Sequence, residues 1–257
     1  MTVTPLYSLA GVLVGMLVGL TGVGGGSLMT PLLVLLFGFH PTTAVGTDLL
    51  YASATKAVGT GVHGSRGTVD WHVVRRLAFG SIPATLATLL VLSRVPKSDS
   101  TSSVIALILG AALVATAVAL FFRQRIVARL APRFEQLPAH RLAQLTTLLG
   151  VALGVMVSLT SVGAGALGMT ALLILYPHLP VKRLVGSDIA HAVPLTLIAG
   201  LGHWWIGSVD VGLLVSLLLG SVPGIIVGSL IATRVSDRVL TPVLAVTLAI
   251  VGVRLLF

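Results

Sequence analysis

Long apolar runs alternate with short polar connections along almost the whole chain. Residues 101–122 and 211–233 are the clearest runs, and each exceeds the roughly 20 residues that an apolar helix needs to cross a bilayer. The pattern predicts ten helical elements in two sets of five. These elements are 5–21, 27–39, 43–62, 71–92 and 102–122, then 142–160, 167–179, 184–205, 211–233 and 238–256. The first two elements of each set are short, so each pair is either one broken helix or two helices that run down and back.

The composition identifies the class of protein. Of the 257 residues, 56% are hydrophobic and only 9% are charged, whereas a soluble domain has roughly 25% charged residues. The mean hydropathy is +1.07. We therefore predict an all-α polytopic membrane protein. The absence of cysteine excludes disulfides and thiolate metal ligands, and no catalytic motif such as HExxH occurs. We expect no enzyme activity, no cofactor and no metal.

The chain contains an internal repeat. The segment GMLVGLTGVGGGSL at 15–28 matches GVMVSLTSVGAGAL at 154–167, an offset of 139. After one additional residue the offset becomes 140, and VGTD at 45–48 matches VGSD at 185–188. The same offset relates the segments GTVD and GSVD, and GSIP and GSVP. We predict a first transmembrane repeat at 1–122, a basic cytoplasmic linker at 123–141 and a second repeat at 142–257.

The two short elements of each half decide its topology, because they set whether a half crosses the membrane an odd or an even number of times. If each pair runs down and back, the loop basic residues divide twelve to three between the two sides. The twelve are Arg66, Arg75, Arg76, Arg123, Arg125, Arg129, Arg133, Arg141, Lys182, Arg183, Arg234 and Arg238, and the three are Arg94, Lys97 and Arg254. Because basic residues collect on the cytoplasmic side, five elements per half are favoured over four. The halves are then inverted repeats, with both termini outside the cytoplasm.

This distribution also explains the net charge of +9, which lies in membrane loops and does not indicate a nucleic-acid partner. We expect the protein to be integral to a cytoplasmic membrane of bacterial or archaeal type and to pass through it several times.

A glycine-rich segment separates the two short helical elements of each half. Unpaired backbone groups are not tolerated in hydrocarbon, so a broken helix survives only where it is buried in protein or lines a cavity. We expect 22–27 and 161–166 to be hairpin apexes that meet near the midplane. A helix that starts there presents free N–H groups and a partial positive charge to an anion. Broken helices at equivalent places in inverted halves are typical of a transporter's substrate site.

Matched polar residues follow the breaks. Asp48 and Asp188 stand near the expected starts of their helices, next to Thr47 and Ser187. Helix capping is one interpretation of the carboxylates, and an ion or proton site in the membrane is the other.

Lys56 is the only lysine or arginine well inside a predicted segment. Its ammonium group either snorkels to the cytoplasmic end or provides charge for an anionic substrate. His191, one turn after Asp188, either bonds to that carboxylate or fills a buried contact.

Other repeated features have structural interpretations. Scattered glycines such as Gly11, Gly110 and Gly252 are expected to let helices pack closely. GTVD and GSVD read as N-caps for the fourth elements of the two halves. Pro83 and Pro223 are expected in the middle of those elements.

The chain resembles the sulfite exporter TauE/SafE family of membrane anion transporters. The resemblance is carried by GLTGVGGGSLMTPLL at 19–33, VGTDLLYASATKAVG at 45–59 and HGSRGTVDW at 63–71, with echoes of all three in the second half. It covers essentially the whole chain and departs from the family pattern at Ala164 and Ala171, where the second copy often has glycine and proline. It implies secondary transport of small sulfur-containing anions such as sulfite, thiosulfate or organosulfonates.

Together these observations predict an alternating-access carrier whose halves move around a midplane site. The residues assigned to the substrate are Gly24, Gly25, Gly26, Ser27, Thr47, Tyr51, Lys56, Ser161, Gly163, Gly165, Ser187 and His191. Asp48 and Asp188 are candidates for coupling to a proton or sodium ion. The alternative is a proton- or cation-coupled carrier of another small solute that uses these two carboxylates. The expected partners are a small anion and the lipid bilayer, and the sequence leaves a homo-oligomer open.

Overall fold

The computed structural model describes residues 5–21, 26–65, 67–96, 98–231 and 237–256. Side chains are described within these ranges except at 18–21, 26–27, 59, 61–65, 99–100, 102, 229–231, 237–241 and 243. The described residues are helical and contain no β-strand. The elements are α1 (Pro5–Thr21), α2 (Gly26–Leu35), α3 (Pro41–Ser65), α4 (Trp71–Arg94), α5 (Asp99–Phe121), α6 (Arg123–Leu130), η1 (Ala131–Arg133), α7 (Ala139–Thr160), α8 (Ala166–Leu175), α9 (Val181–Trp205), α10 (Val211–Ile231) and α11 (Asp237–Leu256).

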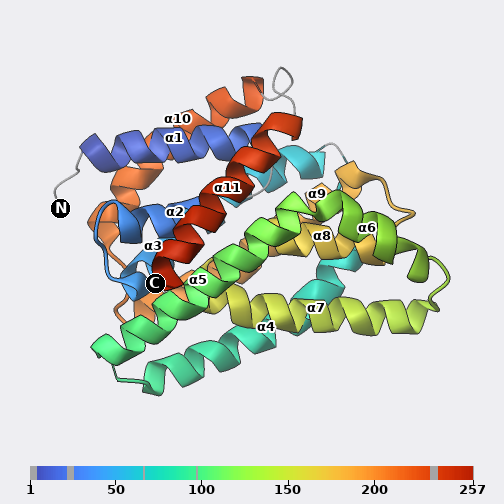
Figure 1. Cartoon of the computed structure of the whole chain (residues 1–257), viewed down its shortest axis with the longest axis horizontal. Coiled ribbons are helices and arrows are strands. Elements are labelled where there is room, and N and C mark those ends of the chain that lie inside the picture. The colour runs from blue at the N-terminus through green and yellow to red at the C-terminus, as the bar shows by residue number, and fades with distance from the viewer. Residues whose placement is uncertain (1–4, 22–25, 66, 97, 232–236, 257) are drawn as a thin grey trace.

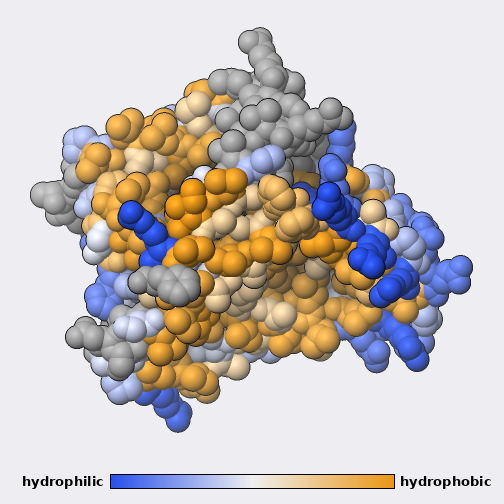
Figure 2. All heavy atoms as spheres, viewed as in Figure 1, coloured by the Kyte–Doolittle hydropathy of each residue, from blue (hydrophilic) through white to orange (hydrophobic). Residues whose placement is uncertain are grey.

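Five of the described helices are long and apolar enough to cross a membrane, by length and composition. They are α4, α5, α7, α9 and α10. Large apolar side chains remain exposed on them, for example Phe79 of α4, which is 80% exposed. Figure 2 shows hydrophobic residues over most of the visible face and hydrophilic ones mainly at its margins. The prediction of an all-α polytopic membrane protein is confirmed.

The helices pack mainly across the predicted division of the chain. Helix α1 packs along α10, α4 along α7, α3 along α9 and α5 along α11, so each pair joins 1–122 to 142–257 (Figure 1). The repeat makes α1 equivalent to α7 and α4 equivalent to α10, so the α1–α10 pair corresponds to the α4–α7 pair. The α3–α9 and α5–α11 pairs each join two equivalent helices. Two-fold-related halves would pack in this way, and the inverted topology and domain boundaries remain predictions.

Equivalent glycines hold the first two of these pairs together. A Cβ at Gly15 of α1 would lie 2.6 Å from the Ser221 carbonyl oxygen of α10. A Cβ at the matched Gly154 of α7 would lie 2.5 Å from the carbonyl oxygen of Ser81 in α4. The backbones therefore approach closely, as small residues allow in membrane proteins. Gly11, Gly110 and Gly252 make similar close contacts, which confirms their expected packing role.

The predicted elements are present, with shifted ends. The second element of each half ends earlier than expected, at Leu35 and Leu175. The third elements begin earlier, at Pro41 and Val181, because their first turns are polar and do not stand out in a hydrophobicity pattern. The basic linker at 123–141 lies outside the ten predicted elements, and it contains α6 and η1.

The expected N-caps are confirmed. The Asp70 side chain accepts hydrogen bonds from the backbone N–H groups of His72 and Val73 at the start of α4. The Asp210 side chain accepts one from Leu213 at the start of α10. Pro83 and Pro223 lie inside α4 and α10 as expected.

Candidate functional site

The second glycine-rich segment breaks the chain between two helices. Helix α7 ends at Thr160 and α8 begins at Ala166. Ser161 has a φ of 58°, and Gly163 and Gly165 have φ of 110° and 124°. These conformations suit glycine and are unusual for serine. The predicted break at 161–166 is therefore confirmed, and the residues around it are buried.

The first glycine-rich segment lies largely outside the described residues. Helix α1 (Pro5–Thr21) and helix α2 (Gly26–Leu35) lie on either side of this segment. Gly24 and Gly25 are outside the described ranges. Gly26 and Ser27 form the start of α2, but the surroundings of these two residues do not belong to the described part of the structure.

Asp48 is a fully buried residue in the third turn of α3. Its Oδ2 accepts hydrogen bonds from the backbone N–H of Thr30, at 3.2 Å, and from the Thr30 hydroxyl, at 2.5 Å. The interpretation of Asp48 as a cap of its own helix is therefore wrong, because α3 starts seven residues earlier at Pro41. The carboxylate instead connects α3 to α2.

Lys56 lies two turns further along α3 and is also buried, with 7% of its surface exposed. Its Nζ donates a 3.3 Å hydrogen bond to the carbonyl oxygen of Ala164, inside the break between α7 and α8. The ammonium group is also attracted by Asp48 and Asp188. The snorkelling interpretation is wrong, since the side chain does not reach the surface and its polar contact lies in the second half of the chain.

Asp188 occupies the place in α9 that corresponds to Asp48 in α3, again in the third turn. It is 4% exposed and does not cap α9, which begins at Val181. Its Oδ1 lies against the first turn of α8, because a Cβ on Gly168 would be only 2.7 Å from this oxygen. Lys56 and Arg123, the first residue of α6, both attract the Asp188 carboxylate.

We call Thr30, Asp48, Lys56, Ser161 and Asp188 the buried polar cluster. Ser161 interacts with Asp48, yet neither Ser161 Oγ nor Asp48 Oδ1 completes a hydrogen bond within the described part of the chain. Asp188 Oδ1 is likewise buried without a hydrogen-bond partner there. Buried polar atoms are normally paired, so three such atoms around one break make this cluster the candidate site.

Tyr51 and His191 occupy matched positions next to the cluster. His191 is fully buried, and its Nε2 lies 2.8 Å from Ser81 Oγ, so of its two interpretations the buried contact is confirmed and the bond to Asp188 is not found. Tyr51 lies near Ser221 at the equivalent place, but neither of their hydroxyls completes a hydrogen bond among the described residues. The two pairs connect α3 to α10 and α9 to α4.

Thr47 and Ser187 have hydroxyl groups that are occupied elsewhere. Thr47 Oγ1 accepts a 3.1 Å hydrogen bond from the backbone N–H of Asp210, and Ser187 Oγ accepts one of 2.8 Å from Asp70. Both hydroxyls therefore hold the loop that precedes a capped helix. The structure does not bring them together with the cluster.

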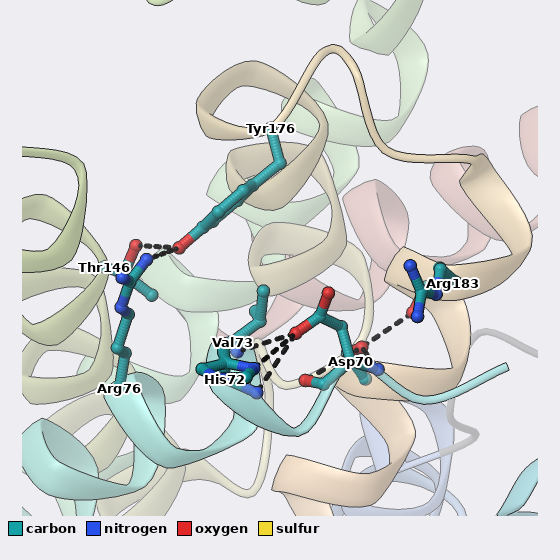
Figure 3. Close-up of polar contacts among 8 residues, drawn as sticks. Asp70, His72, Val73, Arg76, Thr146, Tyr176 and Arg183 are labelled. Carbon is teal, nitrogen blue, oxygen red and sulfur yellow. Dashed lines mark hydrogen bonds and ion pairs between the residues drawn. The ribbon is translucent and has the colours of Figure 1, made fainter. Parts of the chain in front are cut away.

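A second polar network, around Tyr176, lies beside the start of α4 that Asp70 caps (Figure 3). The Arg76 guanidinium donates a 3.2 Å hydrogen bond to the Tyr176 hydroxyl, which also bonds to the Thr146 hydroxyl at 2.8 Å. The network joins α4, α7 and the end of α8. It fixes the C-terminal end of the short helix that starts at the break.

Sequence reasoning missed several of the residues that complete the site. Thr30 donates a hydrogen bond to Asp48, and the Ala164 carbonyl accepts one from Lys56. Ser81 lies beside His191, and Ser221 lies beside Tyr51. Arg123 lies near Asp188. The repeat was a usable signal for the serines, because they stand at the same place in GSIP and GSVP. No three His, Cys, Asp or Glu side chains among the described residues are grouped in a way that could hold a metal ion.

Comparison with known proteins places this arrangement in a family. Residues 7–255 match the family described as sulfite exporter TauE/SafE. The probable membrane transporter protein YjnA of Bacillus subtilis (strain 168) is 40% identical over 213 residues, which cover 82% of this chain and 83% of the relative. The probable membrane transporter protein YdhB of the same organism is 26% identical over 210 residues, covering 80% and 81%.

A shorter match of 68 residues, 44% identical, relates the chain to the probable membrane transporter protein YunE of Bacillus subtilis (strain 168) and covers 26% of this chain and 25% of that protein. No solved structure matches the chain significantly. The match to nearly the whole chain shows that the protein belongs to the sulfite exporter TauE/SafE family, which confirms the expectation of a membrane transporter and not an enzyme.

Proposed function

We propose that the protein is a secondary carrier that moves small sulfur-containing anions across the cytoplasmic membrane by alternating access. Sulfite is the anion that the family description names, and thiosulfate and organosulfonates complete the substrate class that the sequence resemblance implies. The proposed site is the buried polar cluster together with Tyr51, His191, Gly163 and Gly165. The observation that carries the proposal is the hydrogen bond of buried Lys56 to the broken segment between α7 and α8.

Lys56 is the natural contact for an oxyanion. A carbonyl oxygen is a weaker partner for an ammonium group than a charged oxygen, because hydrogen bonds between charged groups are stronger. An arriving anion can therefore replace Ala164 as the acceptor from Lys56 Nζ. The Ser161 hydroxyl, which completes no hydrogen bond, is a second donor at the same break. The first N–H groups of α8 add a partial positive charge.

The charges around the cluster support coupling to a cation. Two carboxylates, Asp48 and Asp188, face Lys56, and Asp188 is also attracted by Arg123. A bound anion would add a negative charge to this balanced set, and an uncompensated buried charge is costly. A proton or a sodium ion that binds Asp48 or Asp188 with the substrate would restore the balance. We therefore assign coupling to these two residues.

Flux measurements in proteoliposomes test the proposal. Purified protein should mediate saturable uptake of labelled sulfite, thiosulfate or a sulfonate, above the leak of protein-free liposomes. Uptake should increase when a proton or sodium gradient points in the direction of transport. A lack of protein-dependent flux for every one of these anions would exclude the proposed substrate class.

A carrier of another small solute, coupled through Asp48 and Asp188, is the second candidate. It is favoured by the Oδ1 atoms of both carboxylates, which are buried and complete no hydrogen bond within the described residues. If the carboxylates themselves hold the transported species, Asp48→Asn and Asp188→Asn should abolish flux and Lys56→Met should scarcely matter. The anion carrier requires Lys56→Met to be the more damaging change for substrate affinity.

A further inference from the structure

A groove lies at the junction between the linker and α7, away from the buried polar cluster. Its volume is about 580 Å³, within the range of roughly 300–1,000 Å³ typical of ligand sites. Arg133 at the end of η1 and Arg141 in the first turn of α7 contribute the two charged side chains of its lining. Phe134, Leu145 and Leu148 contribute apolar surface, and Gln144 is a further polar group.

The polar end of the groove is suited to an anion. Both arginines are exposed, and neither forms an ion pair with a carboxylate among the described residues. No aspartate or glutamate belongs to the lining. Pro138, the N-cap of α7, has no capping side chain, so the partial positive charge of the helix start adds to that of the two guanidinium groups. Guanidinium groups bind phosphate oxygens in a bidentate manner.

The apolar end follows the outer surface of a membrane-spanning helix. Leu145 and Leu148 are one and two turns beyond Arg141 on α7, a helix long and apolar enough to cross the bilayer. Leu148 is 62% exposed, although it is a large apolar residue. The groove therefore changes from basic to apolar along the helix, from the membrane surface toward the hydrocarbon.

We propose that this groove binds one anionic phospholipid. The headgroup phosphate lies between Arg133 and Arg141, and Gln144 donates to the same headgroup. An acyl chain lies along Phe134, Leu145 and Leu148. This order of charge and hydrophobicity matches a lipid in a leaflet, and basic pockets next to membrane helices bind such headgroups. A free phosphate or an acidic peptide would use only the basic end.

Native mass spectrometry of the purified full chain tests this site. After reconstitution into nanodiscs that contain phosphatidylglycerol and phosphatidylcholine, the protein should retain one phosphatidylglycerol molecule in preference to phosphatidylcholine. The variant R133Q/R141Q should bind this lipid about 30-fold more weakly, the effect expected for two arginines at a membrane surface. The matched control is R125Q/R129Q, which removes two exposed arginines of α6 that do not line the groove. It should keep the bound lipid.

The acyl contact has its own test. Leu148→Asn should weaken retention of phosphatidylglycerol and leave any binding of glycerol phosphate unchanged. Equal lipid loss in R133Q/R141Q and R125Q/R129Q would overturn the proposal in favour of a general charge effect. Binding of glycerol phosphate as tight as that of the lipid would also overturn it, since the apolar surface would then play no part.

Discussion

Lys56 in α3 donates its hydrogen bond to the carbonyl oxygen of Ala164, a residue 108 positions later in the break between α7 and α8. The contact joins the only buried lysine of the described residues to the segment with the most unusual backbone. It connects the two predicted halves at the candidate site. A movement of this break relative to α3 would change the bond, so we expect Lys56 to respond both to substrate and to the position of the halves.

The first prediction concerns this lysine. Lys56→Met keeps much of the side-chain volume and removes the charge that we assign to the anion. We expect the apparent affinity for the transported anion to fall about 10- to 150-fold, the range for losing a hydrogen bond to a charged group. Concentration-dependent uptake in proteoliposomes measures this change. Lys182→Met, which removes an exposed lysine at the start of α9, is the matched control and should transport normally.

The second prediction concerns coupling. Asn at position 48 can still accept the hydrogen bonds that Thr30 donates to Asp48, but it cannot become charged. In Asp48→Asn we expect an imposed proton or sodium gradient to stimulate anion uptake no longer, while exchange of anion across the membrane continues. Asp70→Asn is the control, because asparagine caps a helix nearly as well as aspartate. Stimulation that survives in Asp48→Asn and Asp188→Asn alike would contradict the assignment of coupling to these carboxylates.

The third prediction concerns helix packing. Gly154→Ala in α7 places a methyl group against the Ser81 carbonyl of α4, where backbone atoms must move to make room. We expect a loss of about 1–3 kcal/mol in the free energy of unfolding. Thermal melting in detergent would detect it as a lower Tm. Gly212→Ala is the comparison, because its nearest contact would be a tolerable 3.4 Å to the Asp210 side chain.

The sequence predicted more of the fold than of the candidate site. The length and composition of the apolar runs were sufficient to predict the helices, and the internal repeat located the break at 161–166. The positions of Asp48 and Asp188 in their helices could not be predicted, because the polar first turns of α3 and α9 hide the helix starts. Hydrogen-bond partners that lie far apart in the sequence could not be predicted either. The bond from Lys56 to Ala164 depends on how α3 packs against the second half, which local pattern does not encode.

The fourth prediction concerns the network at the end of α8. Tyr176→Phe removes the hydroxyl that joins Arg76 and Thr146 and preserves the ring. Losing two hydrogen bonds should lower the free energy of unfolding by about 1–2 kcal/mol. Thermal unfolding against the parent protein measures this loss. Tyr7→Phe is the control, since Tyr7 packs edge-on against Phe37 and Phe39 through its ring. An equal change in both variants would argue that the network contributes nothing specific.

The last prediction tests the inverted repeat. The chain has no cysteine, so single cysteines can be introduced and labelled from either side of intact cells or oriented vesicles. Arg129→Cys in α6 and Arg183→Cys in α9 should react only with reagent on the cytoplasmic side, because both belong to the basic-rich set of loops. Arg94→Cys, at the end of α4, and Trp205→Cys, at the 92% exposed C-terminal residue of α9, should react only from outside. Labelling of 129 and 183 from opposite sides would mean that each half crosses the membrane an even number of times, and the two breaks would then not approach the site from opposite faces.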